Sequence, residues 1–248
     1  MENTDKNILQ IEDLHISFQR NKSWHEVVKG INFALKKGET LGLVGESGSG
    51  KSVTSLAIMG LLDRKKSKIE GNILFEGKKI SMIFQEPMTA LNPVMKCGKQ
   101  VMEMGVSKEK CLSLFQEVSL PNPEKIFSSY PHQLSGGQRQ RVMIAMALSC
   151  QPDILICDEP TTALDVTVQK TVLDLIKQLQ KKYNIGVIFI THDLGVVSQI
   201  ADKVAVIYKG EIVEMANKEE LFSNPKHPYT KGLIASRPPM DYRPKKLL

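Results

Sequence analysis

Residues 45–52 have the sequence Gly45-Glu46-Ser47-Gly48-Ser49-Gly50-Lys51-Ser52, between an apolar run, Leu41–Val44, and a helix-like run, Val53–Leu62. The spacing G-x-x-x-x-G-K-[ST] between a strand and a helix is the P-loop pattern. Its glycines let backbone N–H groups surround a phosphate, and the helix N-terminus attracts the same anion. Lys51 would reach the β- and γ-phosphates, and the Ser52 hydroxyl would ligate Mg²⁺. Because the flanking pattern disfavours a mere surface turn, the segment predicts a nucleoside-triphosphate site formed by Gly45, Ser47, Gly48, Ser49, Gly50, Lys51 and Ser52.

The composition is that of an ordinary globular chain. With 248 residues, 42% of them hydrophobic and 24% charged, it suits one large α/β domain, with or without an insertion. The net charge of +6 is modest and typical of a solvated surface. The cysteines, which lack C-x-x-C or metal-ligand spacing, indicate a reducing compartment; they are Cys97, Cys111, Cys150 and Cys157. We expect neither a signal peptide nor a membrane span, so any membrane role requires a partner.

Apolar periodicity predicts alternating strands and helices. Extended segments are expected at Leu9–Phe18 (an edge strand or hairpin), Ile31–Leu35, Thr40–Val44, Ile69–Phe75, Ser81–Phe84, Ile154–Cys157, Val187–Ile190, Val204–Ile207 and Ile212–Met215. Besides the helix after the P-loop, helices are expected at Gln138–Leu148, Val166–Tyr183 and Leu194–Ile200. This alternation predicts a mostly parallel sheet with helices on both faces.

The middle of the chain differs from its surroundings. From Met88 to Leu134 prolines separate short helical runs such as Lys108–Val118, and long strands are absent. This pattern predicts a helical insertion. We therefore expect one nucleotide-binding domain over residues 1–235, a helical insertion at about 88–150, and a loose tail at 236–248.

Two carboxylates, Asp158 and Glu159, follow the apolar strand Ile154–Cys157. Ligand sites of α/β proteins lie at the carboxyl ends of strands, so this pair should lie beside the P-loop. Asp158 would hold Mg²⁺ through a water, and Glu159 would orient and polarise the attacking water. A D-E pair alone would more often be a helix cap, but a P-loop in the same chain favours catalysis.

A second anion-receptive helix start is predicted at Leu134-Ser135-Gly136-Gly137-Gln138. Ser135 is a suitable N-cap, and the two glycines leave backbone N–H groups accessible. Standing alone, the segment would be interpreted as a capped helix after a flexible turn.

The order of the motifs resembles that of ATP-binding-cassette (ABC) proteins. The motifs extend over nearly the whole chain, in the order P-loop, Gln85 after a short strand, LSGGQ, strand-DE and Thr191-His192-Asp193. Residues 82–93 (MIFQEPMTALNP) and 227–230 (HPYT) are more specifically similar to nucleotide-binding subunits of bacterial dipeptide, oligopeptide and nickel importers. The resemblance implies a P-loop NTPase of the ABC-cassette fold, with an N-terminal antiparallel β subdomain and an inserted α-helical subdomain.

The resemblance also implies roles for single residues. Gln85 would contact Mg²⁺ and assist catalysis, His192 would contact the γ-phosphate, and Asp165 would communicate between subunits at the ATP site. Phe18 stands where the family places an aromatic side chain on adenine, with Trp24 as a competitor. In the family the LSGGQ of one subunit closes over the ATP of the other, which implies that role for Ser135, Gly136, Gly137 and Gln138.

The function implied is hydrolysis of ATP, with Mg²⁺, to energise uptake of peptides or nickel or other metal chelates. The implied partners are a second ABC ATPase subunit (identical or paralogous), membrane permease subunits and, indirectly, an extracellular solute-binding protein. The subunit would be peripheral at the cytoplasmic face of the cell membrane, without nucleic acid. The alternatives are a soluble ABC ATPase acting on nucleic acid or ribosomes, and a module that binds nucleotide without turnover.

Two features depart from the family pattern. The stretch Gly77–Ser81 is shorter than in most relatives, which carry a helix there. No cysteine follows Cys157, so the cysteine-bound iron–sulfur cluster of some peptide-importer members is not expected. The P-loop and Q-loop wording favours the peptide type and the short chain the nickel type, which leaves the solute open.

Overall fold

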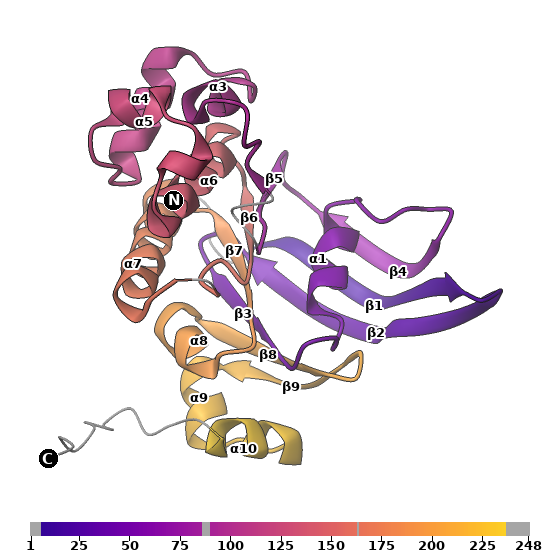
Figure 1. Ribbon diagram of the computed structural model, residues 1–248. Coiled ribbons are helices and arrows are strands. Elements are labelled where there is room, and N and C mark those ends of the chain that lie inside the picture. Colours follow the sequence, from indigo (N-terminus) through magenta and orange to yellow (C-terminus); the bar gives the residue numbers. More distant parts are fainter. Residues whose placement is uncertain (1–5, 86–89, 163, 237–248) are drawn as a thin grey trace, which may run out of the picture.

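The fold consists of two sheets with helices around them (Figure 1). The structure is a computed structural model that describes residues 6–85, 90–162 and 164–236. A six-stranded sheet has the order β5 (Ile80–Ile83), β6 (Ile154–Asp158), β7 (Gly186–Thr191), β3 (Thr40–Val44), β8 (Lys203–Tyr208) and β9 (Glu211–Asn217). A three-stranded sheet has the order β2 (Ser23–Lys36), β1 (Asn7–Arg20) and β4 (Ser67–Phe75).

The six-stranded sheet is parallel from β5 to β8, and only β9 runs antiparallel to its neighbour. Every residue of β3, β6 and β7 is buried, as expected for central strands covered on both faces. Parallel strands present their carboxyl ends at one edge. The segments that follow β3, β5, β6 and β7 therefore all begin at that edge.

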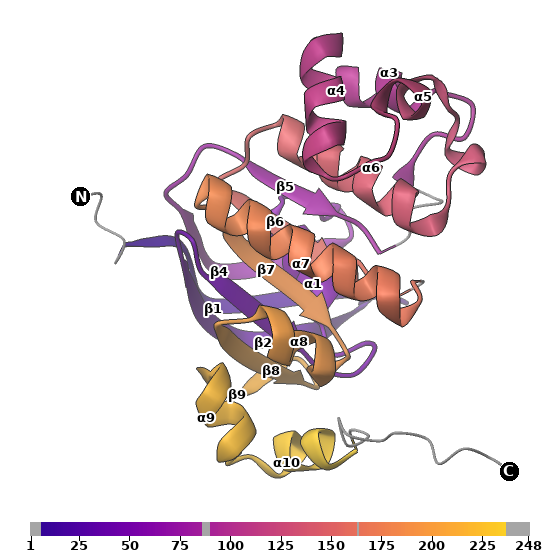
Figure 2. The same cartoon turned by 90° about the vertical axis from the view of Figure 1, so that its left-hand side faces the viewer.

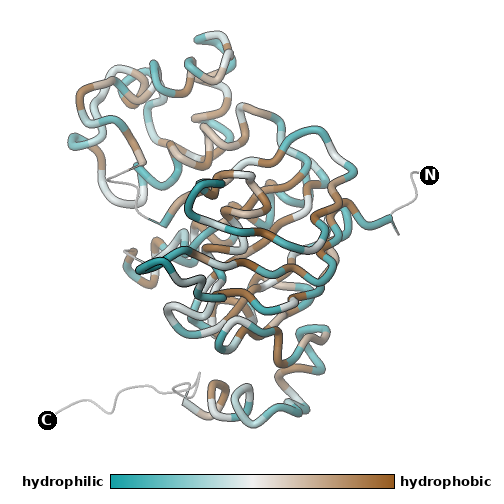
Figure 3. The backbone as a smooth tube through the Cα atoms, turned by 90° about the vertical axis from the view of Figure 1, so that its right-hand side faces the viewer, coloured by the Kyte–Doolittle hydropathy of each residue, from teal (hydrophilic) through white to brown (hydrophobic). Residues whose placement is uncertain are grey.

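The three-stranded sheet is fully antiparallel, with β1 between β2 and β4. The prediction of a hairpin over Leu9–Phe18 is confirmed, because β1 pairs with β2, but that segment is not an edge strand. Inward and outward residues alternate along much of β1. Figure 3 shows the same alternation of hydrophobic and hydrophilic colour along the strands.

The two faces of the large sheet are covered differently. On one face, side chains of β6 and β7 pack against α6 (Gly136–Ser149) and α7 (Val166–Tyr183), and α7 lies across the sheet in Figure 2. On the other face the same strands pack against β1, β2 and the short helix α1 (Lys51–Ile58). A helix lies on each face, as expected, but on the second face the antiparallel sheet packs beside α1.

The helical segment between β5 and β6 forms a lobe at one end of the molecule (Figure 1). It contains α3 (Cys97–Met102), α4 (Lys108–Glu117), α5 (Pro123–Ser128), the 3₁₀ helix η1 (Pro131–Gln133) and α6. Buried side chains of the lobe join the core beneath α6 and α7, so the lobe packs on the sheet through α6. The predicted boundary near residue 88 lies outside the described residues.

The chain continues past β7 with α8 (Leu194–Ile200) and the β8–β9 hairpin, followed by α9 (Lys218–Ser223) and α10 (Pro228–Ala235). Residues 237–248 of the predicted tail lie outside the described residues. The strand–helix–strand–strand series after Gly186 and the helix Val166–Tyr183 are confirmed. The P-loop helix was predicted too long: it ends at Ile58, and Gly60 follows with a φ of +67°.

Candidate nucleotide site

The sheet edge gathers most of the predicted site residues. Gln85 follows β5, Asp158 ends β6 and Glu159 comes next, His192 follows β7, and the P-loop joins β3 to α1. Side-chain contacts join all four segments: Ser52 bonds to Asp158, and Gln85 and His192 both contact Glu159. The prediction that the D-E pair lies beside the P-loop is therefore confirmed.

The P-loop encloses the ammonium group of Lys51. Gly50 is the N-cap of α1 with a φ of +108°, a conformation that costs glycine little and other residues much. Lys51 is only 5% exposed, and its Nζ donates to Gly45 O at 2.7 Å and to Glu46 O at 2.8 Å. Burial lowers the pKa of Lys51, and the negative charges of Glu159 and Asp158 act in the opposite direction. The cation is thus held inside the loop, next to where a phosphate would lie.

Ser52 and Asp158 bring two oxygen ligands together. Ser52 Oγ donates to Asp158 Oδ1 at 3.1 Å, across a sequence separation of 106 residues. Burial raises the pKa of Asp158, and the bond from Ser52 counteracts part of that effect. A hydroxyl and one carboxylate suit Mg²⁺, which keeps several waters and takes further oxygens from phosphates. Within the described residues no group of three or more His, Cys, Asp or Glu side chains is placed to hold a metal ion.

Glu159 has an unusual backbone and three partners. Its φ is +45°, a left-handed conformation that is uncommon for residues other than glycine. Its carboxylate accepts from Gln85 Nε2 at 3.2 Å and Thr162 Oγ1 at 2.8 Å, and His192 Nδ1 lies 3.1 Å from it. Burial acts to raise the pKa of Glu159, but the bonds from His192 and Thr162 outweigh it and hold the pKa below its usual value. The side chain is therefore ionised and oriented at neutral pH.

Two contacts at this edge of the sheet were not predicted from the sequence. Thr162 belongs to the segment after Glu159, and only the turn in the structure brings its hydroxyl back to that carboxylate. Tyr229, from the HPYT segment, accepts the P-loop N–H of Glu46 at 3.2 Å. The HPYT segment is similar to that of importer subunits, but nothing in the sequence indicates that it touches the P-loop.

The LSGGQ segment is satisfied within its own helix. Ser135 Oγ accepts from Gln138 N at 3.3 Å, and Gln138 Oε1 accepts from Ser135 N at 2.9 Å, which together form a capping box. A Cβ on Gly137 would lie 2.6 Å from Val168 Cγ1 of α7, so this position requires glycine. α6 and α1 belong to opposite faces of the sheet. The structure therefore does not gather this helix start with the other site residues.

The remaining predicted residues lie around the site. Asp165 is the N-cap of α7, and its carboxylate accepts from Thr167 N and Val168 N. Phe18 is half-buried on β1, in the cluster that includes Val53 of α1. Trp24 is 49% exposed and pairs with Gln19 at the end of the β1–β2 hairpin. Between the two aromatic candidates, Phe18 is the one that packs on the core cluster shared with α1.

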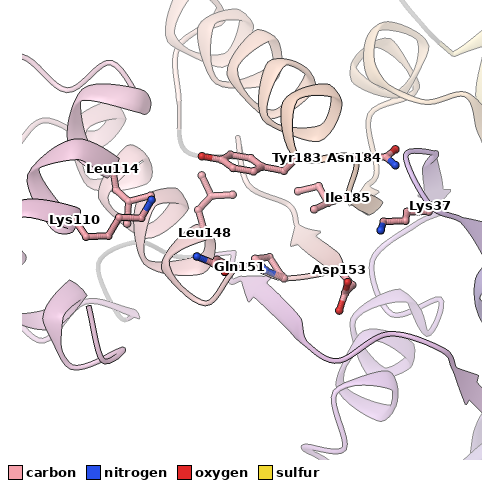
Figure 4. Close-up of a pocket in the computed structure, with 10 residues that line it drawn as sticks. Lys37, Lys110, Leu114, Leu148, Gln151, Asp153, Tyr183, Asn184 and Ile185 are labelled. Atoms are coloured by element: carbon pink, nitrogen blue, oxygen red, sulfur yellow. The ribbon is translucent and has the colours of Figure 1, made fainter. Parts of the chain in front are cut away.

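A cavity of about 340 Å³ lies away from this site (Figure 4). It is bounded by segments that precede strands: Lys37 before β3, Asp153 before β6, and Tyr183–Ile185 before β7. These are the amino ends of the parallel strands, whereas the P-loop lies at the carboxyl ends. The cavity is therefore not part of the nucleotide site.

Comparison with known proteins defines the class. The family model described as ABC transporter matches residues 28–162, and the one described as oligopeptide/dipeptide transporter, C-terminal region, matches residues 213–247. A dimeric ATP-binding cassette, MJ0796, in a post-hydrolysis state with ADP and phosphate, superimposes with a TM-score of 0.73 and 26% identity, over 85% of this chain and 98% of that one. The chain belongs to the ABC transporter family, whose ATP-binding proteins are ATPases that use Mg²⁺, and the predicted fold is confirmed.

The relatives narrow the class. The oligopeptide transport ATP-binding protein OppD of Bacillus subtilis (strain 168) is 50% identical over 260 residues, which covers 94% of this chain and 73% of OppD. The glutathione import ATP-binding protein GsiA of Escherichia coli (strain K12) is 47% identical over 94% of this chain and 42% of GsiA. The chain is thus an ATP-binding, ATP-hydrolysing subunit of an ABC importer, and the alternative of a soluble ATPase acting on nucleic acid or ribosomes is not supported.

Within the three described ranges, no helix is both long enough and apolar enough to cross a membrane.

Proposed function

We propose that this chain energises the uptake of peptides through a membrane permease. The match of residues 213–247 to the oligopeptide/dipeptide transporter C-terminal region and the peptide-transport names of the relatives support this solute class. The observation that carries the catalytic part is the environment of Glu159. Its ionised, oriented carboxylate ends a strand adjacent to β7 and lies close enough to Lys51 for the two charges to interact.

The residues divide the work of phosphoryl transfer. Lys51 exchanges its bonds to the loop carbonyls for the β- and γ-phosphates, while Ser52 and Asp158 would hold Mg²⁺, which would neutralise phosphate charge. Glu159 orients and polarises the attacking water. With Nδ1 of His192 engaged by Glu159, Nε2 is the ring nitrogen left to meet the γ-phosphate. Gln85, bonded to Glu159 in this structure, assists catalysis and contributes to the metal site.

A second ATPase subunit completes the site. The N–H groups of Gly136 and Gly137, at the start of α6, take no part in the capping box and can face a phosphate. α6 lies on the sheet face opposite α1. An ATP clamped by both helix starts is therefore shared between two chains. Asp165 would lie near the boundary between the two subunits, since it precedes Val166, which is 82% exposed. The dimeric arrangement of MJ0796 supports the pairing.

An apolar groove of about 280 Å³ supports the permease as partner. It lies where β5 meets the helical lobe, and flexible or apolar side chains line it: Met59, Met82, Phe84, Met104, Met143 and Met146. Phe84 is 43% and Met104 45% exposed, and with the other lining side chains they form one contiguous apolar surface, a feature that marks interaction sites. The groove adjoins Gln85, so a permease helix seated there would reach the catalytic edge. Under this proposal the chain is peripheral at the cytoplasmic face of the cell membrane, and the solute-binding protein acts through the permease.

The test uses the importer reconstituted from this chain, its partner ATPase and the permease. Met104→Glu should abolish peptide uptake while hydrolysis by the ATPase subunits alone stays near wild type, because the charge enters only the groove. Leu74→Glu, at a similarly exposed apolar position on β4, should leave uptake intact. Normal uptake by Met104→Glu, or equal loss in both variants, would contradict the docking site. Uptake of nickel complexes but not peptides would contradict the solute class.

A further inference from the structure

Glu46 of the P-loop is held at both of its backbone polar groups. Lys51 Nζ donates to Glu46 O at 2.8 Å from inside the loop. Glu46 N donates to the hydroxyl of Tyr229 at 3.2 Å from outside, across a sequence separation of 183 residues. If Lys51 turns to a bound phosphate, it gives up its hold on Glu46, whereas the contact with Tyr229 does not depend on Lys51.

The Tyr229 ring is itself fixed. It stacks on Tyr208 at the end of β8, with ring centroids 4.1 Å apart and an angle of 27° between the planes. It packs against a core cluster that includes Val44, the residue before the P-loop. A rigid ring has little freedom to lose, so its hydroxyl is positioned at small entropic cost.

The helix that carries Tyr229 is anchored at its N-terminus. The carboxylate of Glu214 on β9 accepts from Lys226 N at 2.7 Å and from His227 N at 3.0 Å. His227 Nδ1 then caps α10 by accepting from Tyr229 N at 3.2 Å. Thr230, one residue further, is fully buried. These contacts dock α10 on the β8–β9 hairpin and leave the tyrosine hydroxyl facing the loop.

We propose that Tyr229 is a positioning residue for nucleotide binding: through its hydroxyl, the C-terminal helix α10 fixes the Glu46 peptide of the P-loop. The proposal rests on the assignment of this loop to ATP. A phosphate cradle works through backbone N–H groups set in advance, so a loop that loses an external tether binds phosphate less tightly. Because coupling is reciprocal, bound Mg-ATP should in turn hold α10 more firmly.

The test compares two tyrosine variants of the full chain. Tyr229→Phe keeps the stacked ring and removes only the hydroxyl. We expect the dissociation constant for Mg-ATP, measured by calorimetry, to rise about 3–10-fold, as one hydrogen bond warrants. In the complex with the partner subunit, KM should rise by a similar factor while kcat stays within about twofold, because the tether touches no reacting atom.

Tyr183→Phe is the matched control. Its hydroxyl also makes a side-chain bond, to Glu117 Oε1 at 2.6 Å, but at the opposite sheet edge beside the cavity of Figure 4. It should leave Mg-ATP affinity unchanged. Wild-type affinity in Tyr229→Phe, or an equal loss in both variants, would overturn the proposal.

Two further measurements separate the tether from the loop assignment. Lys51→Ala must abolish Mg-ATP binding; if it does not, the ATP site is wrong, whatever Tyr229→Phe does. Hydrogen exchange of residues 228–235 should slow when Mg-ATP is added to the wild type and slow less in Tyr229→Phe. Equal protection in both proteins would overturn the reciprocal coupling and with it the proposal.

Discussion

The two helix starts suited to phosphate, at α1 and at α6, are built in different ways. The P-loop before α1 is tied to distant segments: Ser52 to Asp158, Glu46 to Tyr229, and Ser49 O to Gly210 N. The start of α6 is tied to itself by the reciprocal bonds of Ser135 and Gln138. One is a site assembled by the fold of this chain, and the other is a capped helix end with glycine N–H groups to spare.

This difference indicates a division of labour. A loop fixed by its own chain can bind nucleotide alone, whereas a self-capped helix start contributes only when another molecule brings a phosphate to it. The affinity of the isolated chain for ATP should thus depend on the α1 side. Turnover in the assembled ATPase should depend on both.

The largest effect is expected at Lys51. Lys51→Ala removes the only cation that the loop carbonyls of Gly45 and Glu46 hold among the described contacts. We expect Mg-ATP binding to fall below detection in calorimetry and hydrolysis to fall by ~10³ or more, the scale seen for cations that stabilise transferring phosphate. Binding at wild-type affinity would show that the P-loop before α1 is not the ATP site.

Glu159→Gln should separate chemistry from binding on that side. The variant keeps the size of the side chain but loses its negative charge and one of its two acceptor oxygens, so hydrolysis should fall by ~10²–10⁴. Mg-ATP should still bind, and the closed dimer with the partner subunit should accumulate in light scattering. Turnover near the wild-type rate with the authentic partner would assign hydrolysis to the other composite site.

Ser135→Ala examines the α6 side. Loss of the N-cap should lower the free energy of unfolding by about 1 kcal/mol, and turnover in the assembled ATPase should fall about tenfold as the helix start loosens. The isolated chain should bind Mg-ATP within twofold of wild type. If its affinity falls together with turnover, the two helix starts act within one chain, and the division of labour is wrong.

The smallest effect concerns Asp158 and pH. Burial raises the pKa of this carboxyl, so the nucleotide-free fold favours its protonated form and loses that stabilisation as pH rises through the raised pKa. Asp158→Asn should therefore raise the unfolding temperature of the nucleotide-free chain at pH values above the raised pKa, with the difference closing as pH falls through it. Mg²⁺-dependent ATP binding of the wild type should weaken over the same fall in pH. An Asn variant less stable than wild type above that pKa would contradict the buried charge.

The nucleotide loop, the carboxylates after a buried strand, and the capped helices were predictable because each depends on neighbours in the sequence. The G-x-x-x-x-G-K-S spacing fixes a loop before a helix, and Ile154–Asp158 combines an apolar strand with its terminal charge. Val166–Tyr183 was predicted to the residue, since apolar side chains recur at helical spacing between the cap at Asp165 and the left-handed Asn184. Parallel strands then bring such ends to one edge as a matter of geometry.

Tertiary structure alone decided which distant groups meet. The contact of Thr162 with Glu159 depends on a strained turn, and that of Tyr229 with Glu46 joins residues 183 positions apart. The resemblance implied an antiparallel β subdomain, but the apolar pattern did not indicate that β1 and β2 cover the second sheet face, because an apolar strand side fits a helix or another sheet equally well. The local pattern of apolar residues indicates which side of a strand or helix is buried. The element that packs against that side is determined only when the whole core packs together.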